Sequence, residues 1–239
     1  MKILAVDTSS FVASACLLNG KKTLYTEDSN KITHSEKLLK LIDNLMVQSS
    51  LKVQDLDYIM VINGPGSFTG ARIGVVTIKG LAITNNTKII AVTSLEAMAI
   101  SHYLSLNTDE EKIICALLDA KNSRAYYGLF KLEKKNGKVK SSPLLEISND
   151  TIDEIKNKLY NLTDVSVVTD IPDVIKEDFE KEYLKVVNKK YTPNASSLIT
   201  FFQNAEKETI NKYETDSYAL DIVYARQSQA ERMKNGEKD

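Results

Sequence analysis

The chain has 239 residues, of which 43% are hydrophobic and 26% charged, and this composition is typical of a globular protein with one large or two small domains. Because 31 basic residues are balanced by 32 acidic ones, the overall charge gives no general attraction for nucleic acid. The two cysteines, Cys16 and Cys115, lie in apolar runs, which indicates buried, reduced thiols and not a disulfide framework.

The apolar run at the N-terminus, Met1–Val6, is too short for a signal peptide and meets Asp7 at once. No stretch of about 18 apolar residues occurs in the sequence. We therefore expect a cytoplasmic protein that has no membrane partner.

The first half of the chain predicts three short strands, then alternating helices and strands. The capping boxes Thr33–Glu36 and Thr93–Glu96 mark two helix starts. Apolar residues at helical spacing follow the first of these boxes. The expected strands are 3–7, 13–18, 22–27, 58–62 and 88–92, and the expected helices begin near residues 33, 70 and 93.

The second half repeats this order and predicts a duplicated α/β fold. Strands are expected at 113–120, 124–132, 138–147 and 165–169, and helices at 151–160, 174–182 and 195–211. We expect an N-terminal lobe over residues 1–106, a reduced C-terminal lobe over residues 107–226 and a frayed tail over residues 227–239.

A glycine-rich loop follows the strand 58–62 directly. Glycines expose the backbone, so this loop could hold a phosphate at the start of the next helix. The spacing fits neither nucleotide motif: Ala71 and Arg72 follow the last glycine where a Walker A loop has Lys and Ser or Thr, and Thr69 breaks the dinucleotide pattern. A structural strand-to-helix turn is the alternative. The loop comprises Gly64, Pro65, Gly66, Ser67, Phe68, Thr69, Gly70 and Arg72.

The helix after this loop combines small residues with apolar ones on nearly every face. Two interior glycines, Gly74 and Gly80, cost about 2 kcal/mol of helix propensity relative to alanine, so close packing is expected in return. The partner in this packing is either a second protein, together with the apolar residues of the helix that begins near residue 33, or the chain's own second lobe.

Catalytic constellations are weakly supported. The only histidines, His34 and His102, lie on different predicted helices and form no metal-binding pair. Asp7 and Asp119 end the first strand of each lobe, where they could hold a metal, but Asp7 is better explained as the acceptor in an Asx turn with the residues after it. A triad of Ser67, His34 and Asp7 lacks a nucleophile elbow.

These motifs together resemble the TsaB family, also called YeaZ. The resemblance rests on Ile3–Ser9, His34–Ser35 with Leu38–Leu39, Gly64–Gly74, Lys79–Ala82, Asp119–Ala120 with Tyr126, and Tyr224 with Arg226, and it extends from Met1 to about Arg226. It implies an actin/sugar-kinase/Hsp70-like (ASKHA) fold with two ribonuclease-H-like lobes, each of βββαβα type with a mixed sheet.

The resemblance also implies a function: a non-catalytic subunit in the biosynthesis of N6-threonylcarbamoyladenosine (t6A), beside the anticodon of tRNAs that read A-starting codons. The implied partners are the transferase TsaD, the ATPase TsaE and a second copy of the chain, with tRNA contacted only indirectly. No catalytic residue, metal or cofactor is expected, apart from weak nucleotide binding at the partner interface. The alternative is an independent ATPase or metallopeptidase of the ASKHA superfamily.

The expected partner interface lies on the two helices of the first lobe. Its residues are His34, Leu38, Leu41, Ile42, Leu45, Gly70, Ile73, Gly74, Thr77, Gly80 and Leu81.

Overall fold

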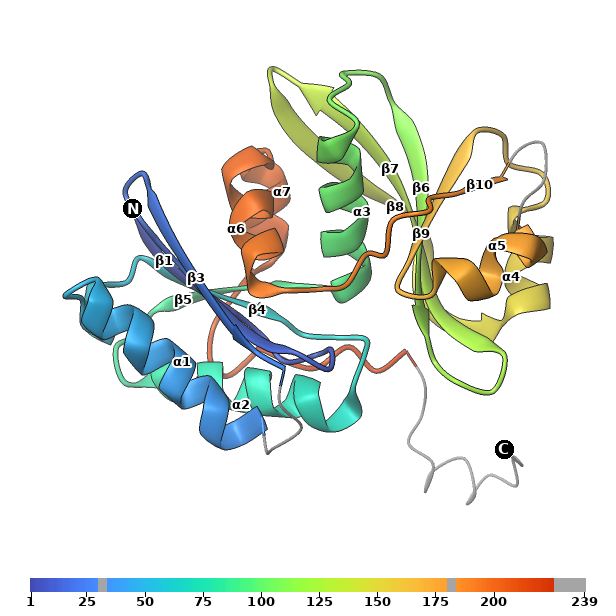
Figure 1. The fold of residues 1–239 in the computed structure, drawn as a ribbon. Coiled ribbons are helices and arrows are strands. Elements are labelled where there is room, and N and C mark those ends of the chain that lie inside the picture. Colours follow the sequence, from blue (N-terminus) through green and yellow to red (C-terminus); the bar gives the residue numbers. More distant parts are fainter. Residues whose placement is uncertain (30–33, 180–183, 226–239) are drawn as a thin grey trace.

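Two mixed β-sheets form the framework of the molecule, and their strand orders correspond except for one additional strand in the first sheet, as the computed structural model shows for residues 1–29, 34–179 and 184–225 (Figure 1). The first sheet has the order β11-β5-β4-β1-β2-β3 and the second the order β10-β9-β6-β7-β8. The first sheet consists of β1 (Lys2–Asp7), β2 (Ala13–Asn19), β3 (Lys22–Asp28), β4 (Tyr58–Ile62), β5 (Lys88–Val92) and β11 (Glu214–Thr215). The second consists of β6 (Lys112–Asp119), β7 (Arg124–Lys135), β8 (Lys138–Thr151), β9 (Val165–Thr169) and β10 (Leu184–Val186).

The two sheets also share their pattern of strand directions. In each, the first three strands form an antiparallel meander, and the next strand pairs parallel with the first. The predicted duplication is therefore confirmed: the chain builds the same supersecondary unit twice.

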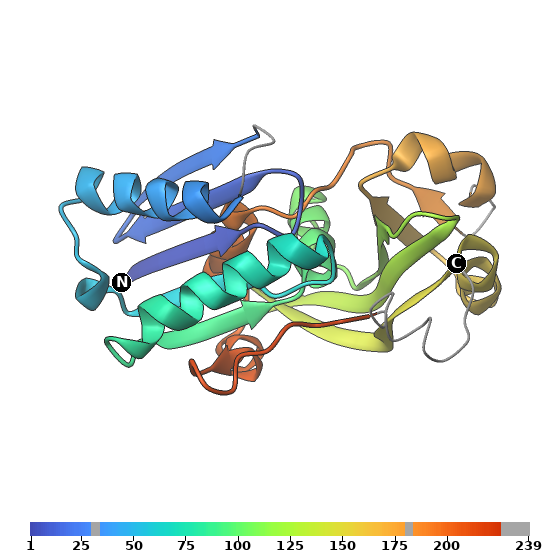
Figure 2. The ribbon, with the colours of Figure 1, turned by 90° about the horizontal axis from the view of Figure 1, so that it is seen from below.

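The helices form layers between and outside the sheets. They are α1 (His34–Gln48), α2 (Phe68–Ile83), α3 (Ser94–Ser105), α4 (Ile152–Leu159), α5 (Pro172–Phe179), α6 (Ala195–Asn204) and α7 (Lys207–Lys212), with a short 3-10 turn, η1 (Val53–Asp55). Helices α1 and α2 cover the outer face of the first sheet, which Figure 2 shows from below. Helices α3 and α6 lie between the two sheets in a shared apolar core, and α4 and α5 cover the outer face of the second sheet.

The single helix predicted over residues 195–211 is not continuous in the structure. It is broken at Ala205, whose backbone is extended and forms a bridge to Val139 of β8, while the Glu206 amide donates to the Val139 carbonyl. This pairing with a strand edge prevents the helix from continuing. The short strand β11, which the sequence pattern did not predict, then pairs antiparallel with β5 and returns the chain to the first sheet. The division at residue 106 stays a prediction.

The two predicted capping boxes belong to the starts of helices α1 and α3. Thr33 lies outside the described residues. Thr93 is the N-cap of α3, and its hydroxyl accepts from the Glu96 amide. The Glu96 carboxylate, however, accepts a hydrogen bond from the Tyr213 hydroxyl at 2.5 Å, so this carboxylate ties α3 to the C-terminal part of the chain.

Candidate functional site

The glycine-rich loop meets the β1–β2 loop of its own lobe. The Ser67 amide donates to the Ser9 carbonyl at 2.8 Å, and the Thr8 hydroxyl donates to the Gly70 carbonyl at 2.7 Å. A Cβ on Gly66 would lie 2.5 Å from the Ser9 carbonyl oxygen, and one on Gly70 only 1.9 Å from the Thr8 carbonyl oxygen. These two glycines are therefore required by contacts within the chain.

The C-terminal strap, residues 216–225, covers the other side of the loop. The Val223 amide donates to the Asn63 carbonyl at 2.9 Å, and the Asn63 side-chain amide donates to the Asp221 carbonyl at 3.0 Å. Gly64 has φ of 106°, and a Cβ there would lie 2.9 Å from the Val223 carbonyl oxygen. The segment that approaches the glycine loop is thus the chain's own C-terminal part, and no local sequence pattern predicted this contact.

The strap ends in an aromatic stack on the first turns of α2. The Arg72 guanidinium lies 3.8 Å from the centroid of the Phe68 ring, and its Nε donates to the Tyr224 hydroxyl at 2.9 Å. The Phe68 and Tyr224 rings are 5.5 Å apart. Both rings remain partly exposed, so the stack forms an arginine-centred aromatic surface at the start of α2.

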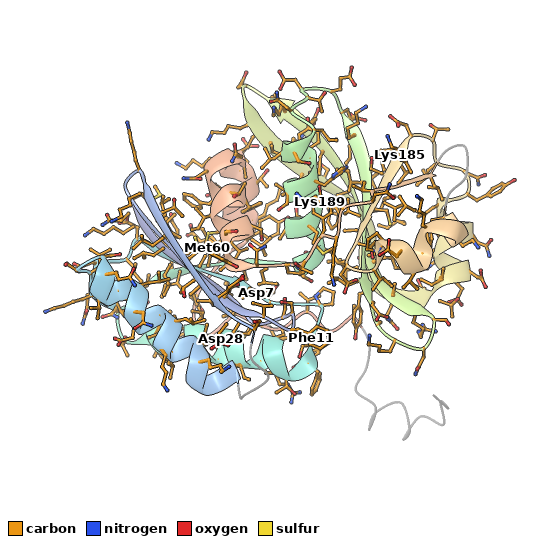
Figure 3. All side chains as sticks on the ribbon, viewed as in Figure 1. Asp7, Phe11, Asp28, Met60, Lys185 and Lys189 are labelled. Atoms are coloured by element: carbon orange, nitrogen blue, oxygen red, sulfur yellow. The ribbon has the colours of Figure 1, made fainter. Side chains whose placement is uncertain are left out.

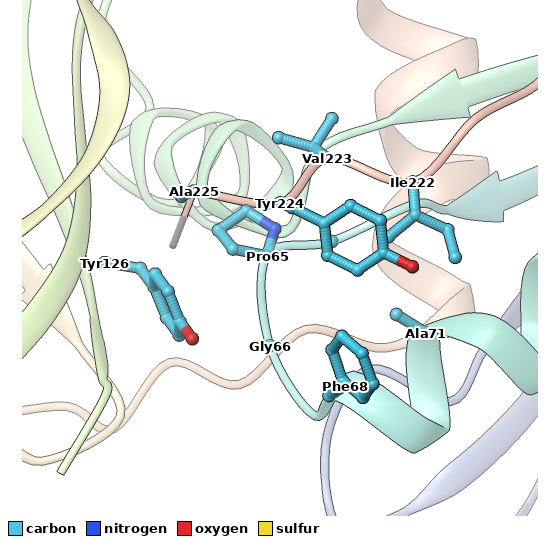
Figure 4. A pocket seen from close by; sticks show the side chains of 10 residues that line it. Pro65, Gly66, Phe68, Ala71, Tyr126, Ile222, Val223, Tyr224 and Ala225 are labelled. Carbon is cyan, nitrogen blue, oxygen red and sulfur yellow. The ribbon is translucent and has the colours of Figure 1, made fainter. Parts of the chain in front are cut away.

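A small pocket remains between the loop, the strap and Tyr126 of the second sheet (Figure 4). Its cavity volume is about 30 Å³. Since a buried water needs roughly 10–15 Å³, this space holds about two water molecules and not a nucleotide. The close contacts of Gly64, Gly66 and Gly70 with the chain's own backbone favour the structural interpretation of the loop over the phosphate cradle.

Asp7 forms the predicted Asx turn. Its Oδ1 accepts hydrogen bonds from the Ser9 amide at 2.8 Å and the Ser9 hydroxyl at 2.6 Å. Complete burial raises the pKa of Asp7 to about 6, although the hydrogen bonds from Ser9 oppose this rise. Asp119 instead pairs with Lys121. Within residues 1–29, 34–179 and 184–225, no group of three or more His, Cys, Asp or Glu side chains is placed to hold a metal ion.

The other residues of the hypothetical triad and metal site are separated or engaged elsewhere. The Ser67 hydroxyl accepts from the Gly70 amide as the N-cap of α2. His102 is buried in α3 with its Nδ1 2.9 Å from the Tyr191 hydroxyl. The side chain of His34 lies outside the described part of the structure. Of the described residues, none forms a helix long and apolar enough to cross a membrane.

The described residues expected at a partner interface fall into three groups. Leu38, Leu41, Ile42 and Leu45 are buried between α1 and the first sheet, so they stabilise the lobe itself. Gly70 and Gly74 face Thr8, whose hydroxyl would lie 2.7 Å from a Cβ on Gly74. Ile73, Thr77 and Leu81 are half-buried, whereas Gly80 has open space around it. Only the last of these groups, formed by Ile73, Thr77, Leu81 and Gly80, can be reached by a partner, and the interface itself stays a prediction.

The exposed faces of the two helices carry apolar residues that the sequence analysis missed. On α2, an outer face is formed by Phe68, Arg72, Val76, Gly80 and Ile83. Val76 is 65% exposed and Ile83 54%; on α1, Leu39 is 53% exposed and Val47 69%. Their positions in the helical repeat could have identified these residues, because they lie on the side of each helix opposite its buried apolar stripe.

Comparison with known proteins identifies the family. A profile described as tRNA N6-adenosine threonylcarbamoyltransferase (TsaD) matches residues 29–212, more than half of the chain. Among curated relatives, the protein TsaB of Haemophilus influenzae is 32% identical and TsaB of Bacillus subtilis 36% identical. The chain belongs to the TsaD/TsaB (YeaZ) family. The aligned part spans about half of each of these two relatives, 56% and 57%, and the same shares of this chain. The TsaB of Buchnera aphidicola subsp. Schizaphis graminum is 27% identical, and the match covers 83% of this chain and 91% of that one.

Solved structures of this family have the same fold. YeaZ from Pseudomonas aeruginosa superimposes with a TM-score of 0.75 at 19% identity, over 93% of this chain and 99% of that one. A second structure, of a Pseudomonas aeruginosa protein with similarity to peptidase YeaZ, gives 0.77 at 19% identity, over 94% and 99%. With the two mixed sheets, this likeness confirms the predicted ASKHA-like fold of two lobes.

Proposed function

We propose that the chain is a non-catalytic subunit in t6A biosynthesis, and that it supports a TsaD transferase by packing the outer face of α2 against it. Curated relatives carry the name "tRNA threonylcarbamoyladenosine biosynthesis protein TsaB", and others of lower coverage are named tRNA N6-adenosine threonylcarbamoyltransferase. The observation that carries the proposal is the exposure of Phe68, Val76 and Ile83 along one face of a helix.

This face has the chemistry of a protein interface. The exposed apolar side chains Phe68, Val76 and Ile83 lie about two turns apart along this face, with Arg72 and Gly80 between them, and such a face is stabilised when another surface excludes water from it. At one end, the arginine-centred stack of Phe68, Arg72 and Tyr224 supplies the residue types that dominate binding energy in interfaces. Gly80 leaves room beside Val76 for the backbone of a partner helix to approach. A second copy of the chain could use the same face, and the docking of TsaE and nucleotide binding there stay predictions.

Two valine substitutions test the proposal. In Val76→Asp, an unpaired carboxylate would be buried in the interface at a cost of about 3 kcal/mol or more, so we expect affinity for TsaD to fall about 100-fold or more. Val174→Asp is the matched control, because Val174 is 69% exposed on α5, on the opposite side of the molecule.

Calorimetric titration of TsaD into each variant measures the effect. Both variants should keep the melting temperature of the wild type, since neither valine is part of a core. Equal affinity of Val76→Asp and wild type for TsaD would show that the outer face of α2 is not part of the interface. Turnover of ATP or peptide by the isolated chain would instead support the enzyme alternative.

A further inference from the structure

Three lysines lie on the segment that leads from β10 to α6. Lys185 is in β10, and Lys189 and Lys190 follow it; all three are exposed. Figure 3 labels Lys185 and Lys189 on this segment, between the second sheet and α3. Four residues of extended chain span at most about 14 Å, which limits the distance between the Cα atoms of Lys185 and Lys189.

Unlike other lysines of the second lobe, these three form no ion pair with the described residues, although Lys189 Nζ lies 5.2 Å from the centroid of the Tyr191 ring. Lys131 pairs with Glu111 at 2.9 Å, and Lys134 with Asp109 at 3.0 Å. In contrast, no carboxylate among the described residues lies within 4.0 Å of Lys185, Lys189 or Lys190. The sequence from residue 184 to residue 205 contains no Asp or Glu. Within the described residues, the three lysines therefore present positive charge that no ion pair neutralises.

Neighbouring groups respond to this charge. Burial, together with the charges of Lys189 and Lys185, lowers the pKa of His102 to about 4. Lys190 acts on Asp170, at the end of the adjacent strand β9, where its charge opposes the rise in pKa that burial causes. The positive field of the segment thus reaches both α3 and the end of the second sheet.

We propose that this lysine surface, formed by Lys185, Lys189 and Lys190, binds the phosphate backbone of RNA. An unpaired lysine neutralises a phosphate and releases its counterions, which is the main source of affinity for nucleic acid independent of sequence. A protein partner would be expected to need apolar anchors, but no large hydrophobic side chain between residues 184 and 203 is exposed. The local composition therefore favours RNA over an acidic protein, and it gives direct contact with tRNA where only indirect contact was expected.

The choice of tRNA as the RNA rests on the proposed function, so the experiment separates RNA binding by the lysine surface from TsaD binding by α2. Fluorescence anisotropy measures binding of a labelled, unmodified tRNA transcript to the full chain at several salt concentrations. The test variant is Lys185→Ala with Lys189→Ala and Lys190→Ala. The control variant removes three exposed lysines from other surfaces: Lys21→Ala, Lys22→Ala and Lys207→Ala.

We expect the test variant to bind tRNA at least about tenfold more weakly at low salt, with a slope of log affinity against log salt smaller by roughly 2 to 3. The control variant and Val76→Asp should bind tRNA like the wild type, and the test variant should bind TsaD like the wild type. Equal loss in both triple variants would overturn the proposal, as would wild-type RNA binding by the test variant or no RNA binding at all. Competition by poly-L-glutamate as effective as that of RNA would assign the surface to an acidic protein segment instead.

Discussion

Two Gly→Ala substitutions in α2 should change stability in opposite directions. Gly70 and Gly80 lie in the same helix, but a Cβ on Gly70 would lie 1.9 Å from the Thr8 carbonyl oxygen, whereas a Cβ on Gly80 has no atom within 4 Å. The contact at Gly70 is more than 1 Å inside the 3.0 Å that real Cβ atoms respect, and the obstacle is backbone. Helix α2 would have to move away from the β1–β2 loop.

The size of the effect follows from what this movement breaks. Overpacking in a well-packed region costs about 1–3 kcal/mol. The hydrogen bonds from the Thr8 hydroxyl to the Gly70 carbonyl and from the Gly70 amide to the Ser67 hydroxyl add roughly 1 kcal/mol each. We therefore expect Gly70→Ala to lower the free energy of unfolding by about 3–5 kcal/mol. Gly80→Ala should raise it by about 0.5–1 kcal/mol, because alanine is the better helix former.

Urea unfolding followed by circular dichroism measures both values on the isolated chain. The difference between the two variants, about 3.5–6 kcal/mol by this reasoning, is a large part of the 5–15 kcal/mol typical of a folded domain. If the two substitutions change stability equally, the reasoning from close backbone contact is wrong and propensity alone governs this helix.

Asp7→Asn should change how the free energy of unfolding depends on pH. Burial raises the pKa of Asp7 from 3.8 to about 6. The contribution of Asp7 to stability is therefore complete below pH 3.8 and is lost as the pH rises through about 6. The variant should therefore match the wild type near pH 4 and exceed it by up to about 3 kcal/mol at pH 7.5 in urea unfolding, and a difference independent of pH would contradict this. Gly64→Ala should loosen the C-terminal strap, because its Cβ would meet the Val223 carbonyl oxygen; limited proteolysis should cut residues 216–225 faster than in Gly20→Ala, which has a similarly positive φ but no neighbour within 4 Å. Equal rates in the two variants would show that Gly64 does not hold the strap.

Much of the fold could be predicted from local patterns. Short β-prone runs and capping residues predicted the repeated order of strands and helices, because each signal acts within a few residues. The break at Ala205 and strand β11 could not be predicted in this way. Both depend on pairing with strands far away in the sequence, β8 and β5.

The candidate site was predicted less completely, for a similar reason. The glycine loop was found from its composition, but its neighbours Thr8, Ser9 and Val223 come from distant parts of the chain. The apolar stripe of α1 was expected to face a partner, yet Leu38 and Leu45 pack on the lobe's own sheet. Periodicity shows that a helix has an apolar face but not which of two surfaces covers it; exposure in the folded chain directs attention to Val76 and Val47.

The central claim, that the chain supports a TsaD transferase through the outer face of α2, is tested most directly by tRNA modification in a reconstituted reaction. TsaD, TsaE, the enzyme that makes threonylcarbamoyl-adenylate, and unmodified tRNA are combined without the chain, with wild-type chain, with Val76→Asp or with Val174→Asp. We predict that t6A forms with the wild type and Val174→Asp, and falls to the level without the chain for Val76→Asp. Full t6A formation without the chain, or with Val76→Asp, would contradict the claim.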